Sequence, residues 1–354
     1  MSRTFFCRLL SILVGVFMGV IKYFGTYIFI IIGYCSIASE TVLFSYSLVF
    51  LSFGLIPLLE LVLPPNKTQT TKESALAYDL IIYSLVPLFL FLMILFLTTI
   101  GGETNRLILY GKISAMGILI GIFGINMAHE LGHRKSKLDR FLAQLLLCSS
   151  QYTHFYIEHN RGHHKRVATP DDPATARKGE NLFLFWIRSI KDAYTSAWHL
   201  ENTSTQKKGL PKFSWQNDMV KYTVFQLLIL AIIGLSFGTP VLLYYILATL
   251  IGILLLESIN YLEHYGLLRK KISEAAYERV QDKHSWNSDH ILGRYLLFEL
   301  TRHSHHHANS LVKYPDLLSR EGSPQLPTGY PGMILLSLVP PLFFKVMDKK
   351  LKKK

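Results

Sequence analysis

Six apolar runs constrain this chain more than any other feature, because most are close to the roughly 20 residues that a helix needs to cross a bilayer. They occupy residues 23–38, 42–63, 80–100, 107–127, 222–237 and 241–261. Half of the 354 residues are hydrophobic and only 17% are charged, which is unusual for a water-soluble domain. The sequence therefore predicts an all-α integral membrane protein with six transmembrane helices.

The basic residues are concentrated in the segments between and after these runs. The formal net charge is +13, and residues 128–220 alone contain 14 lysines and arginines. Cytoplasmic loops of membrane proteins are enriched in lysine and arginine. We therefore expect 128–220, 262–331 and both ends of the chain to lie on the cytoplasmic side of the cell inner membrane. No recognisable nucleic-acid-binding module accompanies the charge, so nucleic acid is not an expected partner.

One membrane domain is expected at residues 22–348, with an apolar N-terminal extension at 1–21 and a basic tail at 349–354. The three cysteines form no CxxC pair, so an iron–sulfur electron carrier must be on another chain. Three further apolar pieces are too short, or too interrupted by proline, to cross the membrane: 141–148, 182–190 and 333–344.

Nine of the fourteen histidines fall into four groups near the ends of apolar runs or in the polar segments beyond them. The groups are His129 and His133 in HELGH; His159, His163 and His164 in EHNRGHH; His264 in NYLEH; and His303, His306 and His307 in RHSHHH. Spacings of three and four residues place rings on one face of a helix, so we expect the members of a group to share a metal ion. Nine imidazoles suit two ions, and a redox task favours iron over zinc. Together with the apolar runs, this predicts a histidine-rich di-iron cap on the cytoplasmic side.

Two other interpretations of the histidines account for fewer of them. HELGH also fits the HExxH motif of zinc proteases, with Glu130 as general base, but most of the grouped histidines then have no role. A purely structural role suits one isolated histidine better than four spaced groups. We expect none of the remaining histidines to bind metal: His154, His199, His284, His290 and His305.

Three glutamates, Glu130, Glu158 and Glu263, each adjoin one of the grouped histidines. A carboxylate can accept the second N–H of a metal-bound imidazole and so orient the ring. We expect this role for the three glutamates. The alternative for each is a salt bridge with a nearby arginine or lysine.

Together the motifs resemble the integral-membrane alkane hydroxylases of the AlkB type, which are unrelated to the DNA-repair dioxygenase of the same name. The similarity runs from about residue 22 to residue 348. The related membrane fatty-acid desaturases share spaced histidine boxes but not the EHYG and ATPxDPAT context. The segments that carry the resemblance are HELGH, EHNRGHHKRVATPDDPATAR, NYLEHYGLLR, HSWNSDHI, RHSHHHAN and LPTGYPG.

The resemblance implies a non-haem di-iron monooxygenase that hydroxylates the terminal carbon of medium- to long-chain n-alkanes with O2. It implies that the nine grouped histidines bind two iron ions, and that electrons come from rubredoxin, itself reduced by a rubredoxin reductase. The alkane would enter from the membrane lipid. In one departure, His305 stands where the family usually has aspartate. A desaturase or hydroxylase of fatty acids or acyl lipids, and a non-catalytic histidine-rich membrane module, are the alternatives.

Two smaller sets of residues suggest contacts with partner and substrate. Small side chains at Ser45 and Ser52 on the second apolar run could widen a substrate channel, although helix packing is their commoner role. Basic residues beside the histidines could guide an acidic electron donor: Arg134, Lys135, Lys165 and Arg166.

Overall fold

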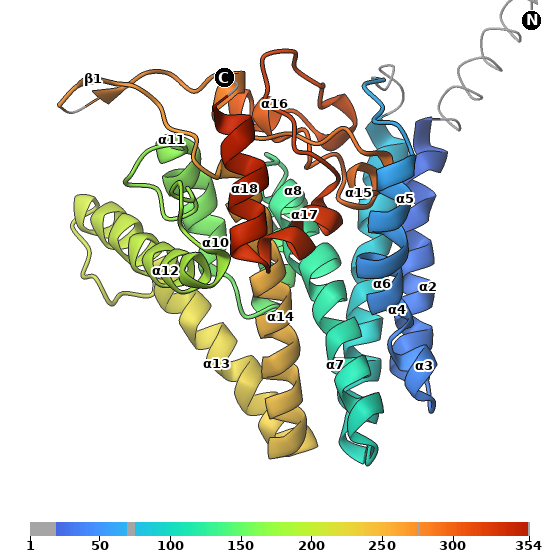
Figure 1. Ribbon diagram of the computed structural model, residues 1–354. Helices are drawn as coiled ribbons and strands as arrows, with labels where there is room; N and C mark the ends of the chain where they lie inside the picture. Colours follow the sequence, from blue (N-terminus) through green and yellow to red (C-terminus); the bar gives the residue numbers. More distant parts are fainter. Residues whose placement is uncertain (1–18, 69–74, 275, 353–354) are drawn as a thin grey trace, which may run out of the picture.

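The computed structural model describes residues 19–68, 75–274 and 276–352. Most of the predicted N-terminal extension and the last two residues of the predicted basic tail lie outside the described residues. Long helices run side by side toward one end of the molecule (Figure 1). Shorter helices and loops, mainly residues 133–217 and 265–352, gather at the other end, which we call the cap.

The membrane class predicted from the apolar runs is confirmed. Within the described residues, five helical stretches are long and apolar enough to cross a membrane: Gly19–Ala38, Leu76–Gly102, Arg106–Gly132, Asp218–Phe237 and Thr239–His264. Their regular helices are α2 (Gly25–Ala38), α6 (Ala75–Thr99), α7 (Arg106–Leu119), α8 (Met127–Gly132), α13 (Asp218–Phe237) and α14 (Thr239–His264). Short 3₁₀ turns at Lys22–Phe24 and Ile100–Gly102 adjoin α2 and α6.

The run predicted as the second span, 42–63, is helical but divided. It comprises α3 (Val42–Ser45), α4 (Ser47–Phe50), a π-helical turn (Leu51–Leu55) and α5 (Ile56–Val62). A turn at Tyr46 interrupts it, so its continuous apolar part, Ser47–Val62, is shorter than the five long stretches. The segment nevertheless leads from the far end of α2 back to the cap (Figure 1).

Polar caps and a glycine turn set where several long helices begin. Asn105 and Asn217 each accept a hydrogen bond from a backbone N–H two residues later, at 3.0 and 2.9 Å, and so start α7 and α13. Between α13 and α14, Gly238 has a φ of 86°, which glycine adopts without strain, and Pro240 follows in the first turn of α14. A tight turn therefore separates α13 from α14.

α7 and α14 approach each other closely because glycines lie in their contact. A Cβ at Gly117 would lie 2.5 Å from the side chain of Ile251, and a Cβ at Gly252 would lie 2.5 Å from the side chain of Ile120. Small residues permit such close packing of membrane helices. Since α7 continues through the π-helical segment Ile120–Asn126 into α8, this contact places the cap ends of two spans side by side.

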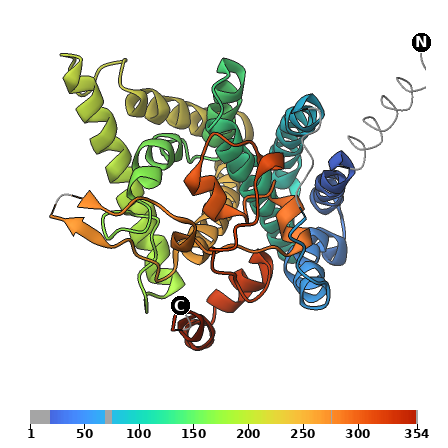
Figure 2. The ribbon, with the colours of Figure 1, turned by 90° about the horizontal axis from the view of Figure 1, so that it is seen from above.

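Short elements build the cap. Its helices are α9 (Lys137–Ser149), α10 (His154–Ile157), a π-helical turn (Glu158–His163), α11 (His164–Arg166), α12 (Leu182–Lys207), α15 (Ile291–Leu296), α16 (His303–Ala308), α17 (Tyr330–Ser337), α18 (Pro340–Leu351) and 3₁₀ turns at Asp282–His284 and Tyr314–Asp316. Strands β1 (Lys271–Ser273) and β2 (Ala276–Tyr277) pair antiparallel. From above, the C-terminal cap segments lie over the middle of the bundle (Figure 2).

Two of the short apolar pieces form different structures in the cap, one within a single helix and the other divided between two helices. The piece predicted at 182–190 begins a much longer helix, α12, whose polar continuation carries it to Lys207. The piece at 333–344 is divided between α17 and α18, because Pro340 begins a new helix. Neither is among the five long apolar stretches.

Candidate metal centre

The grouped histidines reach one place in the cap from four parts of the chain. His129 and His133 lie in and directly after α8, and His264 is the last residue of α14, so these three come from the cap ends of spans. The π-helical turn Glu158–His163, with the start of α11, supplies three more. The short helix α16 supplies the last three.

Their nitrogens form two groups, and within each group the candidate ligand atoms all lie within 4.8 Å of one another. The five-histidine group contains His129, His133, His159, His164 and His306. The four-histidine group contains His163, His264, His303 and His307. All nine predicted histidines are thus brought together.

The spacing of the nitrogens fits shells of ligands around metal ions. Neighbouring Nε2 atoms are 3.0 to 3.2 Å apart in the five-histidine group and 2.8 to 3.2 Å apart in the four-histidine group. Two nitrogens bound at right angles to one ion, each at about 2.1 Å, would be separated by about 3.0 Å. Because imidazole ligands suit transition metals, each group could hold one such ion.

Burial keeps these rings in the metal-binding form. The pKa values of His159 and His306 lie well below the ordinary value, first because the rings are removed from water and second because neighbouring histidines disfavour a positive charge. The same two causes lower the pKa of His133, His164 and His303. Neutral imidazole, with a free lone pair, is the form that binds metal.

The motif EHNRGHH does not place its three histidines as predicted. We expected its members to share one ion, with His159 and His163 stacked at helical spacing. These two rings do stack, with their centroids 5.1 Å apart, but they belong to different groups. The segment forms a π-helical turn rather than an α-helix, and in a π-helix hydrogen bonds join residues i and i+5. His159 and His164 therefore come together, with their Nε2 atoms 3.0 Å apart, and His163 joins the other group.

The motif RHSHHH is divided in the same way. His303 and His307 belong to the four-histidine group, whereas His306 belongs to the five-histidine group. Two pairs of consecutive residues, His163 with His164 and His306 with His307, therefore contribute one ring to each group. Since consecutive Cα atoms are about 3.8 Å apart, the two groups must be adjacent.

Two of the three predicted glutamates contact arginine rather than a histidine ring. Glu130 accepts hydrogen bonds from the guanidinium of Arg134 at 2.9 and 3.2 Å. Glu158 pairs with Arg166 at 2.5 Å. These are the salt bridges given above as the alternative. A charged guanidinium is a stronger donor to a carboxylate than a neutral imidazole, which accounts for the preference.

The third glutamate, Glu263, lies at the edge of the four-histidine group. One carboxylate oxygen is 3.1 Å from Nε2 of His303. The other accepts a hydrogen bond from the hydroxyl of Tyr330 at 2.8 Å. Glu263 is therefore the one predicted glutamate in contact with a ring.

Asp172 makes the ring-orienting contact that sequence reasoning assigned to glutamates. Its two oxygens lie 3.1 and 3.0 Å from Nδ1 of His163, and it also accepts a hydrogen bond from Thr175 at 2.6 Å. Held in this way, His163 directs Nε2 toward the other ligands. The segment ATPDDPAT was noticed as a motif, but nothing in it distinguishes buried Asp172 from exposed Asp171.

The basic residues near the histidines differ in exposure. Arg134 is only 8% exposed, and it also contacts Asp79 at 2.8 Å, so it cannot guide a partner as predicted. Lys135 and Lys165 are exposed, and Arg166 is half-buried against Glu158. An exposed basic edge therefore remains beside His133 and His164.

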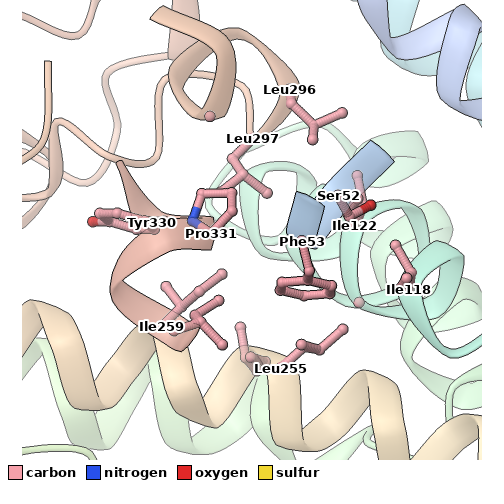
Figure 3. Close-up of a pocket in the computed structure, with 14 residues that line it drawn as sticks. Ser52, Phe53, Ile118, Ile122, Leu255, Ile259, Leu296, Leu297, Tyr330 and Pro331 are labelled. Carbon is pink, nitrogen blue, oxygen red and sulfur yellow. The ribbon is translucent and has the colours of Figure 1, made fainter. Parts of the chain in front are cut away.

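An apolar pocket lies between segments of the bundle and of the cap (Figure 3). Helical segments of the bundle and loops of the cap form its wall, which includes Ser52, Phe53, Ile118, Ile122, Leu255, Ile259, Leu296, Leu297, Tyr330 and Pro331. Tyr330 connects the pocket to the four-histidine group through Glu263. Of the two serines noted in the sequence, Ser52 lines this pocket, whereas Ser45 packs against Gly111 and leaves no room for a Cβ there.

Known proteins with similar sequences agree with this geometry. Residues 106–334 match the family described as fatty acid desaturase. The alkane 1-monooxygenase of Ectopseudomonas oleovorans is 38% identical over 86% of this chain and 78% of its own length. That of Pseudomonas putida is 37% identical over 84% of this chain and 76% of its own length. Alkane 1-monooxygenase 1 of Pseudomonas aeruginosa is 37% identical over 87% of this chain and 83% of its own length.

The chain belongs to the alkane 1-monooxygenase family. The 106–334 match contains every histidine of both groups, and it also includes Asp172, Glu263 and Tyr330. Family membership together with the ion pair between Glu130 and Arg134 removes the zinc-protease interpretation, because that carboxylate is not free to act as a general base.

His305, the departure from the usual pattern of the alkane 1-monooxygenase family, lies outside both groups. Its Nδ1 accepts a hydrogen bond from the backbone N–H of Leu318 at 2.9 Å. Burial, and then the charge of Arg320, lower the pKa of His305, which keeps the accepting nitrogen free. Since an aspartate carboxylate could accept the same hydrogen bond, the replacement preserves an acceptor at this position.

Proposed function

We propose that this chain hydroxylates the terminal carbon of medium- to long-chain n-alkanes, using O2 and two electrons from rubredoxin at a pair of iron ions. One observation carries the proposal: nine imidazole nitrogens converge in two adjacent groups, one of which is connected to an apolar pocket through Glu263 and Tyr330. The names of the related proteins support the same reaction.

The two groups of histidines would each hold one iron ion. When bound, the iron pair would supply the redox chemistry that activates O2. Asp172 accepts the Nδ1 proton of His163 and so holds the tautomer whose Nε2 is free to bind metal. Glu263 offers a negative charge at the edge of the four-histidine group, where it would balance part of the cationic charge.

The pocket suits a substrate that has no polar group. An alkane can be held only by removing its surface from water, which contributes about 0.8 kcal/mol per CH2. Phe53 and Leu255 lie on bundle segments that carry apolar side chains toward the outside, so a hydrocarbon already dissolved in the bilayer would have a short path inward. The apolar wall also excludes water from the carbon to be oxidised.

We further propose that all six predicted segments cross the cell inner membrane and that the cap faces the cytoplasm. The shorter segment Ser47–Val62 leads back to the cap, which gives an even number of crossings. The concentration of lysine and arginine in cap segments supports the cytoplasmic orientation.

Rubredoxin would approach the exposed basic edge beside the five-histidine group. Lys135 and Lys165 follow His133 and His164 closely in the sequence and are exposed. Charges of this kind accelerate encounter with an acidic protein, and added salt weakens the effect.

Product analysis tests the proposal. Purified protein loaded with iron and supplied with O2, rubredoxin, rubredoxin reductase and a deuterated n-alkane should form the primary alcohol, with about two irons retained per chain. Formation of an alkene, or turnover of acyl lipids alone, would instead support a desaturase, which the fatty acid desaturase match favours as the alternative. Full activity after stringent removal of iron would refute the di-iron proposal.

A further inference from the structure

Glu60 is a buried carboxylate in an otherwise apolar helix. It lies in α5, in the sequence IPLLELV, and is 1% exposed. Among the described residues, no lysine, arginine or histidine forms a salt bridge with it, and its Oε2 atom has no hydrogen-bond partner. A buried, unpaired carboxylate is expensive, and ionisable residues in membrane segments usually have a function.

The contacts of Glu60 are with two glycines in the cap. Oε1 accepts a hydrogen bond from the backbone N–H of Gly293, in α15, at 2.7 Å. The carboxylate also lies directly against Gly329, so that a Cβ at Gly329 would overlap both of its oxygens. A Cβ at Gly293 would lie 3.2 Å from Oε1, which is also tight. One side chain thus sits between α15 and the loop that leads into α17.

Both glycines belong to the wall of the apolar pocket or adjoin it. Gly293 lines the pocket, and Gly329 directly precedes two other lining residues, Tyr330 and Pro331. The carbonyl of Gly329 accepts a hydrogen bond from Met333 at 3.0 Å, which begins α17. Since Tyr330 also donates to Glu263, the position of this loop determines where the pocket meets the metal centre. Figure 3 shows Tyr330 and Pro331 next to each other in the wall of the pocket.

We infer that Glu60 is a positioning residue for regioselectivity: by holding Gly293 and Gly329, it fixes the wall formed by Tyr330 and Pro331 and so determines which carbon of the substrate reaches the metal centre. The inference rests on the proposed function, because it takes the apolar pocket to be the alkane site. The Glu60 carboxylate contacts Gly293 and Gly329 rather than the nine grouped histidines, and Glu60 does not line the pocket, so it acts through the two glycines.

The first test replaces the carboxylate. Glu60→Ala should raise the ratio of subterminal to terminal alcohols at least about threefold, because displacement of a bound substrate by about 1 Å can change reaction rates up to 10²-fold. Iron content should stay at the wild-type value. Glu60→Gln keeps the acceptor for Gly293 and nearly the same volume, so it should restore a product ratio close to that of the wild type.

The second test fills the space that the carboxylate occupies. Gly329→Ala alone should shift the product ratio in the same direction, because its methyl group would collide with Glu60. In the double variant with Glu60→Ala the collision is removed, so its product ratio should be no more altered than that of Glu60→Ala. Gly54→Ala, in the same helical segment with nothing within 4 Å of its added Cβ, is the matched control and should change nothing.

An unchanged product ratio in both Glu60→Ala and Gly329→Ala would overturn the inference. Loss of iron from Glu60→Ala in parallel with activity would also overturn it, since Glu60 would then support the metal centre rather than the pocket wall. If Glu60→Ala does not accumulate in membranes, the other two single variants provide the test. The inference then requires a shifted product ratio in Gly329→Ala and a ratio close to that of the wild type in Glu60→Gln. Failure of the wild-type protein to form any alcohol would refute the proposed function instead.

Discussion

The five-histidine group and the four-histidine group differ in what surrounds them. All four rings of the smaller group are buried, and two carboxylates, Asp172 and Glu263, contact them. In the larger group, His133 and His164 are half-buried, and no carboxylate pairs with its rings in the part of the chain that the structure describes. The four-histidine group is closed and contacts carboxylates, whereas the five-histidine group is more open and has exposed lysines beside it. We therefore expect an ion in the four-histidine group to be held more firmly, and exchange with solvent and electron donor to occur beside the five-histidine group.

Replacing one histidine of either group should have the largest effect on alcohol formation. Comparing the two variants tests each group independently. His264→Ala and His129→Ala are each expected to lower alcohol formation by more than about 100-fold, beyond the usual cost of losing an outer partner of a metal ligand. Iron per chain should fall in both variants. Exposed His199, replaced by alanine, is the control. Wild-type iron and activity in either ligand variant would refute the assignment of that group.

Removing a carboxylate should weaken only the four-histidine group. Asp172→Ala leaves Nδ1 of His163 without its acceptor, and loss of such a partner typically costs about 10- to 100-fold in metal affinity or activity. Competition with a chelator, followed by iron analysis, measures the effect. Its neighbour Asp171 is exposed, so Asp171→Ala should behave as wild type. Equal losses in the two variants would show that Asp172 has no special role.

Acid should destabilise the metal-free protein through the buried rings of both groups. Burial, and then neighbouring histidines, lower the pKa of His133, His159, His164 and His306 below 6.5 in the folded state. Below about pH 6.5 the unfolded chain therefore binds more protons than the folded chain, and stability falls as the pH falls. Thermal unfolding of chelated protein between pH 7.5 and 5.5 should show a decreasing midpoint. His133→Ala should make the unfolding midpoint depend less on pH. A steeper dependence on pH would contradict the attribution of this effect to the buried histidines.

The smallest effect is expected at the basic edge of the five-histidine group. Exchanging Lys135 and Lys165 for glutamate should slow reduction by rubredoxin about three- to tenfold at low salt, and less at high salt. Stopped-flow measurement at two ionic strengths gives both quantities. Lys191, exposed on α12, is the control for charge reversal elsewhere. Reduction that is insensitive to ionic strength would exclude this docking edge.

The sequence allowed prediction of which histidines converge but not of how they divide. Four histidine groups, near the ends of apolar runs or in the polar segments beyond them, identify the nine rings because so many grouped imidazoles suit metal binding better than a structural role. Spacing alone assumes α-helical geometry, and the π-helical turn at 158–163 violates that assumption. The division of the two motifs between two groups therefore required the structure.

Long-range contacts were likewise not predictable from local patterns. Arg134 is surrounded by positive neighbours in the sequence, yet it is buried in an ion pair with Asp79 from a distant helix. Glu60 stands in an apolar run with no motif around it, and its partners lie more than 200 residues away. The interruption of the second apolar run at Tyr46 also leaves no proline or glycine signal. Patterns along the chain predict elements, whereas these contacts depend on how the elements are packed.

The consecutive pairs His163–His164 and His306–His307 have a consequence for how such a centre can change. Each peptide bond within a pair joins a ring of one group to a ring of the other, so insertion or deletion of a single residue there would displace rings in both groups at once. Neither half can be lost, duplicated or exchanged for a different coordination type by altering one segment. Reducing the site to one histidine group would therefore require a changed backbone in both places.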